Sequence, residues 1–459
     1  MSLISSISGT RGTIGGRPGE NLTPVDIVNF AAAYGTWLTL KSPLRTVVIG
    51  RDARPSGEMV QQLVSATLVA LGFRVIDLGL STTPTVEVAV PDMEAAGGII
   101  LTASHNPVNW NALKLLNARG EFVTQKDGLE ILAILQEGVF PFAPVEKLGV
   151  VVRPGDYGQE HIAKILKLHL VDRYAISRAG FRVVVDGVNS SGGIFVPRLL
   201  EALGITDVVQ LNCEPTGWFA HNPEPLAENL TEICSYIREH GADLGICVDP
   251  DVDRLVFVDN EGNLFGEEYT LVAVADYVLQ HQQSTVVSNL SSSRALRDVA
   301  ARHGCRYAAA AVGEVNVVEI MKRTDALIGG EGNGGIIYPE LHYGRDALVG
   351  IALFLSHLAK SGKTVAELRA SYPDYYMAKR KLELSEGFDT DTLLQAFKAA
   401  YQHERINDID GVKVDFAESW VHLRKSNTEP IVRIYTEART QAEADALADR
   451  VIGELKALG

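Results

Sequence analysis

The sequence predicts an α/β fold, with three related mixed α/β domains and a C-terminal α+β domain around a central cleft. A strand, a helix, a second strand, another helix and a third strand recur three times, and this pattern changes after residue 370. Strands that alternate with helices over short connections are typical of parallel α/β layers. Three copies in 459 residues indicate three related domains, because a single core seldom grows beyond about 250–300 residues.

Each copy starts with an apolar, β-branched strand and continues into a helix that ends at a glycine: Gly72, Gly204 or Gly304. The predicted first strands are 45–50, 181–186 and 284–290; the helices are 58–71, 194–203 and 294–303; the second strands are 73–78, 205–211 and 305–312; the third strands are 97–101, 242–248 and 326–328. We expect the three domains to occupy residues 1–153, 154–259 and 260–370.

Residues 371–459 have a different order of elements and form the expected α+β domain. A strand at 379–384 and a helix at 389–402 come first. Three further strands and a closing helix follow, at 412–415, 420–423, 431–436 and 441–458.

Composition and charge disfavour several classes of protein. Hydrophobic residues make up 46% of the chain, and its mean hydropathy of +0.07 is that of a folded globular protein. We find no apolar run long enough for a membrane span and no signal peptide, and the net charge of −15 disfavours nucleic acid. The widely spaced cysteines indicate reduced core thiols: Cys213, Cys234, Cys247 and Cys305. We therefore expect a cytoplasmic protein whose partners include neither a membrane nor a nucleic acid.

A functional loop is expected at the end of each third strand, where ligands bind in α/β sheets. In the first copy, strand 97–101 leads into residues 102–107 (TASHNP), and Pro107 stops the strand from continuing regularly. Ser104 is thereby placed for chemistry. The alternative is a simple turn in which Ser104 and Asn106 bond only nearby backbone.

In the second copy the loop reads DPDVDR, and its alternating acids Asp249, Asp251 and Asp253 can converge on one side. Three crowded carboxylates repel one another unless a hard cation lies among them, and oxygen ligands suit Mg²⁺. An EF-hand is excluded, because Arg254 stands where its glycine belongs. A solvated hairpin turn between strands 244–248 and 255–258 is the alternative.

In the third copy, residues 330–335 (GEGNGG) match G-x-G-x-x-G, but the extended segment IIYP follows where a dinucleotide site needs a helix. Glycines let the backbone approach a ligand closely, and Glu331 and Asn333 are the side chains left to bind sugar hydroxyls. A tight hairpin with incidental polar residues is the alternative.

The C-terminal domain carries RKSNTEP at 424–430, between two predicted strands. Its cationic, hydroxyl and amide donors suit a phosphate group, with arginine supplying a bidentate fork. The alternative is a hairpin turn with solvated charges. The candidate phosphate-binding residues are Arg424, Ser426, Asn427, Thr428 and, in the next strand, Arg433.

A serine, a magnesium site, a hydroxyl-binding loop and a phosphate-binding loop together indicate phosphoryl transfer on a sugar phosphate. TASHNP, DPDVDR, GEGNGG and RKSNTEP resemble, in this order, the active-serine, metal, sugar and phosphate loops of the α-D-phosphohexomutases. The segments SGTRG at 8–12 and GRDARPS at 50–56 agree, so the resemblance spans essentially the whole chain. This family contains phosphoglucomutase, phosphomannomutase and phosphoglucosamine mutase.

The resemblance implies that Ser104 carries a phosphoryl group, gives it to the substrate and recovers it from the other end of a bound hexose 1,6-bisphosphate. Phosphate would thereby move between C6 and C1 of the sugar. The resemblance also implies one Mg²⁺ per chain, held by an oxygen at Ser104 together with Asp249, Asp251 and Asp253.

The family's other catalytic positions are also matched. By the same resemblance, Arg11 and Arg254 would balance charge near the phosphoserine. Lys114 matches the proton-handling lysine, and His105 is a second candidate for that role. A solvated lysine on a helix or strand is the alternative for Lys114. The sequence also departs from the family near this residue, since Ala112 stands where the family commonly has glycine.

Two segments bear on the identity of the sugar. VGEVNV at 312–317 resembles phosphoglucosamine mutases and broad-specificity archaeal-type enzymes, whereas bacterial sugar loops usually have Ser and His where Asn333 and Gly335 stand. We expect conversion of glucosamine 6-phosphate to glucosamine 1-phosphate, with a broad phosphoglucomutase/phosphomannomutase as the alternative. A metal-dependent phosphatase would leave the sugar and phosphate loops without a purpose, and a non-catalytic sensor would tend to lose Ser104 or an aspartate. The expected partners are small hexose phosphates, for a monomer or a homodimer.

Overall fold

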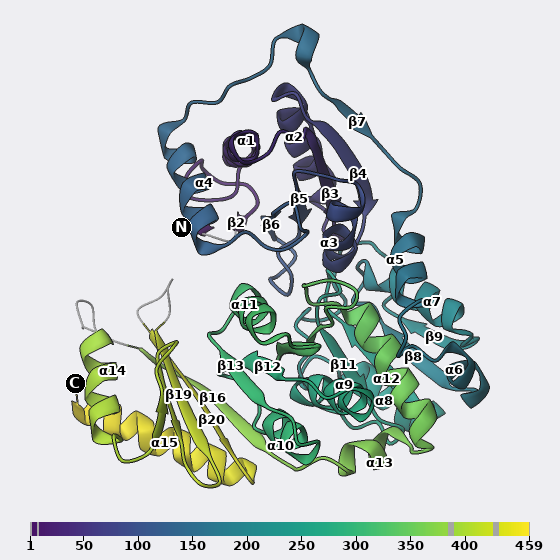
Figure 1. Cartoon of the computed structure of the whole chain (residues 1–459), viewed down its shortest axis with the longest axis vertical. Helices are drawn as coiled ribbons and strands as arrows, with labels where there is room; N and C mark the ends of the chain where they lie inside the picture. Colours follow the sequence, from purple (N-terminus) through teal and green to yellow (C-terminus); the bar gives the residue numbers. More distant parts are fainter. Residues whose placement is uncertain (1, 7–8, 384–389, 426–430, 459) are drawn as a thin grey trace. The chain divides into compact units, whose positions relative to one another are not determined.

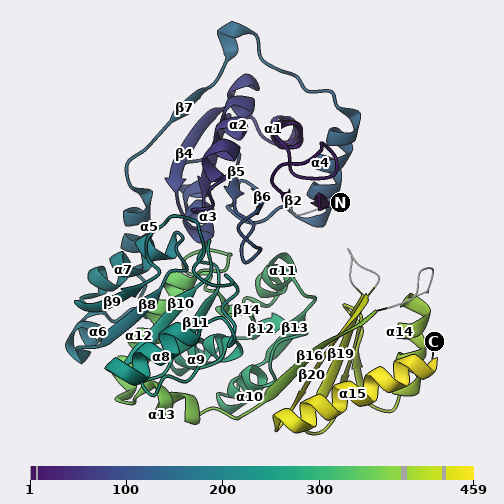
Figure 2. The same cartoon turned by 180° about the vertical axis from the view of Figure 1, so that it is seen from behind.

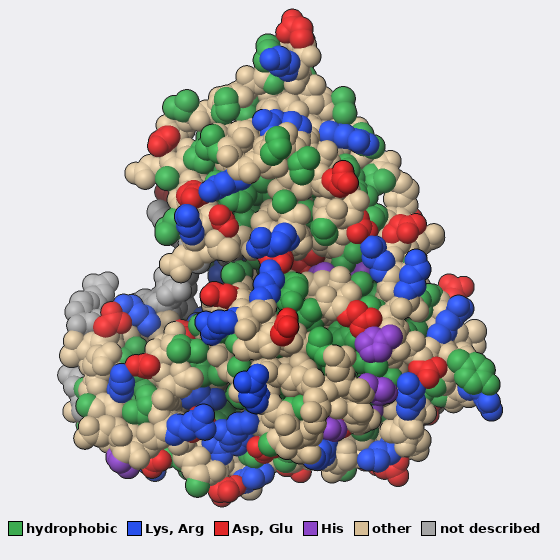
Figure 3. All heavy atoms as spheres, viewed as in Figure 1, with side chains coloured by type: hydrophobic (Ala, Val, Ile, Leu, Met, Phe, Trp, Pro, Cys, Tyr) green, Lys and Arg blue, Asp and Glu red, His purple; other side chains and the backbone are tan. Residues whose placement is uncertain are grey.

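The computed structural model describes residues 2–6, 9–383, 390–425 and 431–458 (Figure 1). These residues form two compact units. The first contains Met1–Tyr277 and Asn333–Arg369, and the second contains Val278–Gly332 and Ala370–Gly459. Among the described helices, none is both long enough and apolar enough to cross a membrane. Figure 3 shows acidic and basic side chains interspersed on the drawn face of the N-terminal part of the first unit.

The first unit begins with a seven-stranded sheet in the order β1-β2-β6-β5-β3-β4-β7. Its elements are β1 (Ile4–Ser6), β2 (Gly9–Thr13), α1 (Pro24–Lys41), β3 (Thr46–Arg51), α2 (Gly57–Ala70), β4 (Arg74–Leu80), α3 (Thr83–Asp92), β5 (Gly97–Leu101), β6 (Trp110–Leu116), α4 (Gln125–Glu137), a 3₁₀ turn (Val145–Lys147) and β7 (Val150–Val152). Alternate residues face two cores, because successive side chains of a strand point to opposite faces. Val47 and Ile49 pack with α1, α2 and α4, whereas Val48 packs with α3.

The first unit continues with a four-stranded sheet in the order β11-β10-β8-β9. Its elements, with the returning segment, are α5 (Tyr157–Ile165), α6 (Arg173–Ala179), β8 (Arg182–Asp186), α7 (Gly192–Leu203), β9 (Asp207–Leu211), α8 (Thr231–His240), β10 (Leu244–Val248), β11 (Leu255–Val258), α9 (Glu267–His281), β15 (Gly335–Ile337), α12 (Ala347–Ser361) and α13 (Val365–Ala370). Residues of α12 are almost completely buried as far as Leu358, so this helix is a central element of the unit.

The second unit pairs an α/β layer with an antiparallel sheet. Its elements are β12 (Val286–Asn289), α10 (Ala295–Arg302), β13 (Tyr307–Ala310), α11 (Glu314–Thr324), β14 (Ile328–Glu331), β16 (Tyr376–Glu383), α14 (Thr390–Ala400), β17 (Arg405–Asn407), β18 (Val412–Asp415), β19 (Trp420–Lys425), β20 (Ile431–Ala438) and α15 (Gln441–Leu458). The antiparallel sheet has the order β16-β20-β19-β18-β17, and α14 and α15 pack on it around Phe397 and Val451 (Figure 2).

The predicted threefold repeat is confirmed by the order of the parallel strands. In each layer the first strand lies between the third and the second, giving β5-β3-β4, β10-β8-β9 and β14-β12-β13. The loops that leave β5, β10 and β14 therefore occupy equivalent places at the carboxyl ends of related strands, where α/β proteins bind ligands.

The structure adds elements that the sequence patterns do not predict. After the loop that follows β5, the chain returns as the unpredicted antiparallel strand β6, whereas β11, which returns after β10, matches the strand anticipated at 255–258. β2 extends the first sheet beyond β6, so the segment at 9–13 is an extra strand. The short, polar strand β17 pairs with β18 and has no apolar alternation to mark it.

Candidate active site

The serine loop leaves β5 as predicted and holds Ser104 in a left-handed backbone conformation, with φ of 49°. The amide of Ser104 donates to Thr102 Oγ1 at 2.9 Å, and the Thr102 hydroxyl donates to Asp52 at 2.6 Å. A non-glycine residue in this conformation is uncommon and is retained where its surroundings fix it. The loop is therefore a shaped structure and not only a turn with local hydrogen bonds.

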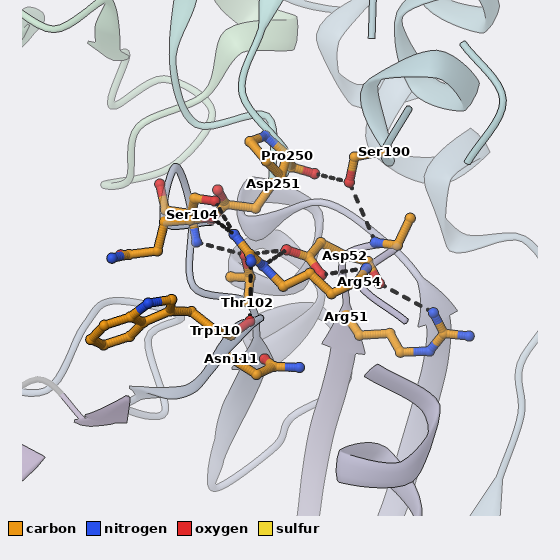
Figure 4. Close-up of polar contacts among 12 residues, drawn as sticks. Arg51, Asp52, Arg54, Thr102, Ser104, Trp110, Asn111, Ser190, Pro250 and Asp251 are labelled. Carbon is orange, nitrogen blue, oxygen red and sulfur yellow. Dashed lines mark hydrogen bonds and ion pairs between the residues drawn. The ribbon is translucent and has the colours of Figure 1, made fainter. Parts of the chain in front are cut away.

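Arg54 fixes the shape of the serine loop from the side of β3 (Figure 4). Its guanidinium donates to the carbonyls of Ser104 at 2.5 Å, Asn106 and Pro107 at 2.6 Å, and Trp110 at 3.0 Å. The Arg54 guanidinium also forms an ion pair with Asp52 at 3.0 Å, and Arg54 is 1% exposed. Sequence reasoning singled out the segment at 50–56 but missed this role, because the partners are carbonyls of a distant segment.

The three aspartates converge next to Ser104. The Ser104 hydroxyl donates to Asp249 Oδ2 at 2.8 Å, while Asp249 Oδ1 accepts the amides of Asp253 and Arg254, both at 3.1 Å. The aspartates lie between the antiparallel strands β10 and β11, so the hairpin anticipated as an alternative is present and carries the carboxylates. All three are at most 1% exposed.

This cluster fits a hard divalent cation. Ligand atoms of Asp249, Asp251 and Asp253 lie within 4.8 Å of one another. Oδ1 of Asp251 and Oδ1 of Asp253 are buried and accept no hydrogen bond from any residue that the structure describes. Burial raises the pKa of Asp249, and the two neighbouring carboxylates raise it further. Buried, partly unsatisfied oxygens are the ligands that Mg²⁺ takes.

Two basic side chains lie against the same carboxylates. Lys114 Nζ is 2.8 Å from Asp251 and 3.8 Å from Asp253, and Arg345 donates to Asp253 at 2.6 Å. Burial opposes the charge on Lys114, but the carboxylates of Asp251 and Asp253 outweigh this and raise its pKa. Thr83 donates to Asp251 at 2.6 Å. Sequence reasoning found Lys114 and missed Arg345 and Thr83, whose neighbouring sequence has no distinctive motif.

Strand pairing places Arg11 on the face of the sheet that carries Lys114. In the β2–β6 pair, Gly9 lies opposite Lys114 and Arg11 lies opposite Ala112. Directly opposed residues share a face of the sheet. Gly9 packs closely against β6, because a Cβ built on it would lie 2.0 Å from the Leu113 carbonyl oxygen.

The remaining predicted catalytic residues, Arg254 and His105, both lie near Glu224. Arg254 forms an ion pair with Glu224 at 3.1 Å. His105 Nδ1 is 3.5 Å from the Ser104 hydroxyl, and its Nε2 is 4.0 Å from Glu224. Burial and the positive charge of Arg254 lower the pKa of His105, which is therefore neutral at pH 7.

The two predicted sugar-binding side chains are placed differently. Glu331, in the second unit, is 5% exposed and accepts from the Asn289 amide at 2.8 Å and from the Gly313 backbone at 3.0 Å. Asn333, in the first unit, is half-buried, and its side-chain oxygen accepts from the Gly335 amide at 3.3 Å.

The phosphate-loop strands present a row of three cations. Arg424 of β19 lies opposite Arg433 of β20, which lies opposite Lys381 of β16. Like charges opposed on one face destabilise a sheet, so an anion over this row would relieve their repulsion. Sequence reasoning missed Lys381, because the strand register that aligns it is not visible in the sequence. Ser426, Asn427 and Thr428 lie outside the described residues.

Within the second unit, Asp410 links this row to the layer that carries Glu331. Its Oδ2 is 2.8 Å from Arg424 Nε and accepts the Val312 amide at 2.9 Å. The neighbouring Gly313 amide donates to Glu331. Asp410 therefore orients Arg424 and bonds the turn that contacts Glu331.

These sites on three related α/β layers and an antiparallel sheet define an enzyme that transfers phosphoryl groups on sugar phosphates. Four family models, for phosphoglucomutase/phosphomannomutase alpha/beta/alpha domains I, II and III and the C-terminal domain, match residues 5–141, 159–262, 266–376 and 380–454. The chain belongs to this family, the α-D-phosphohexomutases, and is a phosphohexomutase.

Individual relatives agree with the family assignment. A phosphoglucomutase/phosphomannomutase of Thermococcus kodakarensis is 35% identical over 94% of this chain and 95% of its own. A phosphoglucosamine/phosphogalactosamine mutase of Sulfurisphaera tokodaii is 29% identical over 99% of each chain. The crystal structure of a phosphoglucomutase/phosphomannomutase family protein of Burkholderia thailandensis shares the fold, with a TM-score of 0.86 at 24% identity over 99% of this chain and 97% of that one.

Proposed function

We propose that this phosphohexomutase moves phosphate between C6 and C1 of a hexose through a phosphoserine at Ser104 and a bound hexose 1,6-bisphosphate. One observation carries the proposal: the Ser104 hydroxyl lies 2.8 Å from Asp249, beside Asp251 and Asp253. A nucleophile fixed beside three buried carboxylates suits reversible phosphoryl transfer with a metal ion.

The chain's own residues hold the reacting serine in place. Arg54 and Thr102 fix the loop, so Ser104 is oriented before the substrate binds. Asp249, Asp251 and Asp253 would hold one Mg²⁺ per chain, with an oxygen at Ser104 as a further ligand. When bound, this ion would supply neutralisation of charge on a phosphoryl oxygen. Arg254 and Arg11 would add positive charge near the phosphoserine.

Two groups near Ser104 have opposite proton preferences. Lys114 is held protonated by Asp251 and Asp253 and is suited to donate a proton to the sugar oxygen that leaves the phosphoryl group. His105 is neutral at pH 7 and is suited to accept a proton at Nδ1 from a hydroxyl near Ser104. We therefore assign Lys114 as the general acid and His105 as the candidate base.

The rest of the substrate would be bound by the other two loops. Arg424, Arg433 and the loop residues Ser426, Asn427 and Thr428 would bind the phosphate that is not being transferred. Glu331 and Asn333 would bind sugar hydroxyls. A metal-dependent phosphatase would need neither set, so both favour a mutase.

We propose glucosamine 6-phosphate as the preferred substrate, converted to glucosamine 1-phosphate. The segment at 312–317 and the Sulfurisphaera relative support an amino sugar. A second candidate, favoured by the Thermococcus relative, is the same reaction on glucose and mannose phosphates.

The experiment is to measure kcat/KM for the 6-phosphates of glucosamine, glucose and mannose, with Mg²⁺ and a hexose 1,6-bisphosphate as activator. A preference for glucosamine of about a hundredfold or more supports a group that binds the C2 substituent. Comparable values for all three support the broad enzyme. Release of inorganic phosphate without isomerisation would overturn the mutase mechanism.

A further inference from the structure

A second group of metal-ligand side chains lies in the first unit, apart from the three aspartates. His161 of α5, His342 and Asp346, the N-cap residue of α12, bring ligand atoms within 4.8 Å of one another. The side chains of His161 and Asp346 are 0% exposed and that of His342 is 9% exposed. None of the three serves the proposed phosphoryl transfer.

The three ligand atoms converge at metal-ligand spacing. Asp346 Oδ2 is 3.0 Å from His161 Nε2 and 3.3 Å from His342 Nε2. Zinc binds imidazole nitrogen and carboxylate oxygen at about 2.0–2.2 Å, so tetrahedral ligands lie about 3.3–3.6 Å apart, at or slightly beyond the distances found here. Hydrogen bonds alone give similar distances. The outer contacts of the three side chains therefore decide between a hydrogen-bonded cluster and a metal site.

His161 and Asp346 make outer hydrogen bonds of the kind that orient ligands in metal sites, whereas His342 Nδ1 faces a carboxylate without a hydrogen bond to it. His161 Nδ1 is 2.9 Å from the Thr85 hydroxyl, and His342 Nδ1 is 3.4 Å from Glu87 Oε2. Asp346 Oδ1 accepts the amides of Leu348 and Val349 at the start of α12, which directs Oδ2 toward both rings. Metal-bound histidines almost always donate their second nitrogen to such an oxygen.

The neighbour Glu87 gives a chemical reason for a cation. If His342 donates through Nε2 to Asp346, its Nδ1 faces the Glu87 carboxylate and needs a second proton. With a metal on Nε2, a neutral imidazole is sufficient, because Nε2 binds the metal and Nδ1–H points toward Glu87. A dication also balances the two buried carboxylates, Asp346 and Glu87.

The backbone makes room for Glu87 at this position. A Cβ built on Gly344 would lie 2.0 Å from Glu87 Oε2 and 2.9 Å from His342 Cε1. A glycine at 344 thus permits the close approach of the carboxylate to the ring.

We propose that His161, His342 and Asp346 form a site for a transition-metal dication, best matched by Zn²⁺, that joins α3, α5 and α12. Imidazole ligands favour zinc over magnesium, so the site would not compete for the cation of the aspartate cluster.

The segments that the site joins are those that support the aspartate loop. α3 begins at Thr83, whose hydroxyl and amide bond Asp251. Beside Asp346, Arg345 bonds Asp253 and the Ala347 amide donates to the Val252 carbonyl. A bound ion would therefore restrain the segments that hydrogen-bond the aspartate loop.

The test measures zinc retained by the full chain in excess Mg²⁺, which keeps the aspartate cluster filled. We expect one Zn²⁺ per chain after dialysis, a higher melting temperature when zinc is present, and loss of both in His161→Gln and in His342→Gln. Glu87→Gln should weaken zinc binding about 10- to 100-fold. The matched control is His403→Gln, at an exposed histidine, which should retain zinc as the original chain does.

X-ray absorption at the zinc edge of the unaltered protein removes any dependence on folding of the variants. The proposal predicts two imidazole nitrogens in the zinc shell. It is overturned if the protein retains no zinc, if the histidine variants retain as much as the control, or if the shell contains only oxygen.

Discussion

The Arg54 guanidinium donates to the Ser104 carbonyl at 2.5 Å while it pairs with Asp52, so one buried side chain ties the reacting loop to the end of β3. Three further carbonyls, those of Asn106, Pro107 and Trp110, accept from the same group. The position of the serine therefore depends on a residue that has no chemical step of its own.

Arg54→Met should lower kcat by about a hundredfold, because small displacements of a reacting group have effects of this size. It should also lower the free energy of unfolding by about 3–5 kcal/mol, since Asp52 is left buried without its partner. Turnover and thermal melting measure the two effects. Arg74→Met, at an exposed arginine of β4, is the matched control and should change neither. A normal kcat in Arg54→Met would contradict the role of Arg54.

Binding of Mg²⁺ should tighten as pH rises. The pKa of Asp249 is raised in the folded, metal-free protein, so its carboxyl keeps its proton to a higher pH than it does in the unfolded chain. The metal-free protein therefore loses stability as pH rises through this raised pKa. Mg²⁺ displaces the proton, and its affinity should increase up to about tenfold per pH unit in that range. Titration calorimetry at several pH values measures this, and a pH-independent affinity would refute it.

Lys114 should act as a proton donor and not merely as a charge. Lys114→Met should lower kcat by about 10²–10⁴-fold, the usual contribution of general acid catalysis. Lys114→Arg keeps the positive charge but cannot release a proton at neutral pH, so it should be about as slow. Because Nζ contacts Asp251, the Met variant should also bind Mg²⁺ more tightly. Near-normal turnover in Lys114→Arg would show that charge alone suffices.

Lys381→Met should raise KM about tenfold with little effect on kcat, because Lys381 extends the cation row of Arg424 and Arg433, which we propose binds the phosphate that is not transferred. Lys379→Met is the control: it lies two residues earlier on β16, opposite Tyr435 and farther from the loop. Steady-state kinetics of both variants decide this, and equal KM values would remove Lys381 from the site.

The sequence predicted the repeat and its loops because both depend on local signals. Apolar strands and helix-ending glycines such as Gly72 set the alternation, and polar residues after the third strands mark the ligand side. Arg54, Arg345 and Lys381 could not be predicted in their roles, since each depends on a partner brought close by tertiary pairing. His161 and His342 are likewise far apart in sequence and meet only through the packing of α5 and α12.

The role of Ser104 is tested most directly by incubating the protein with a hexose 1,6-bisphosphate and Mg²⁺ and locating the transferred phosphoryl group by peptide mass spectrometry. A phosphoserine mechanism predicts one phosphoryl group on Ser104, its discharge to a hexose monophosphate during turnover, and neither event in a folded Ser104→Ala variant. A phosphoryl group on another residue, or near-normal isomerisation by Ser104→Ala, would contradict it.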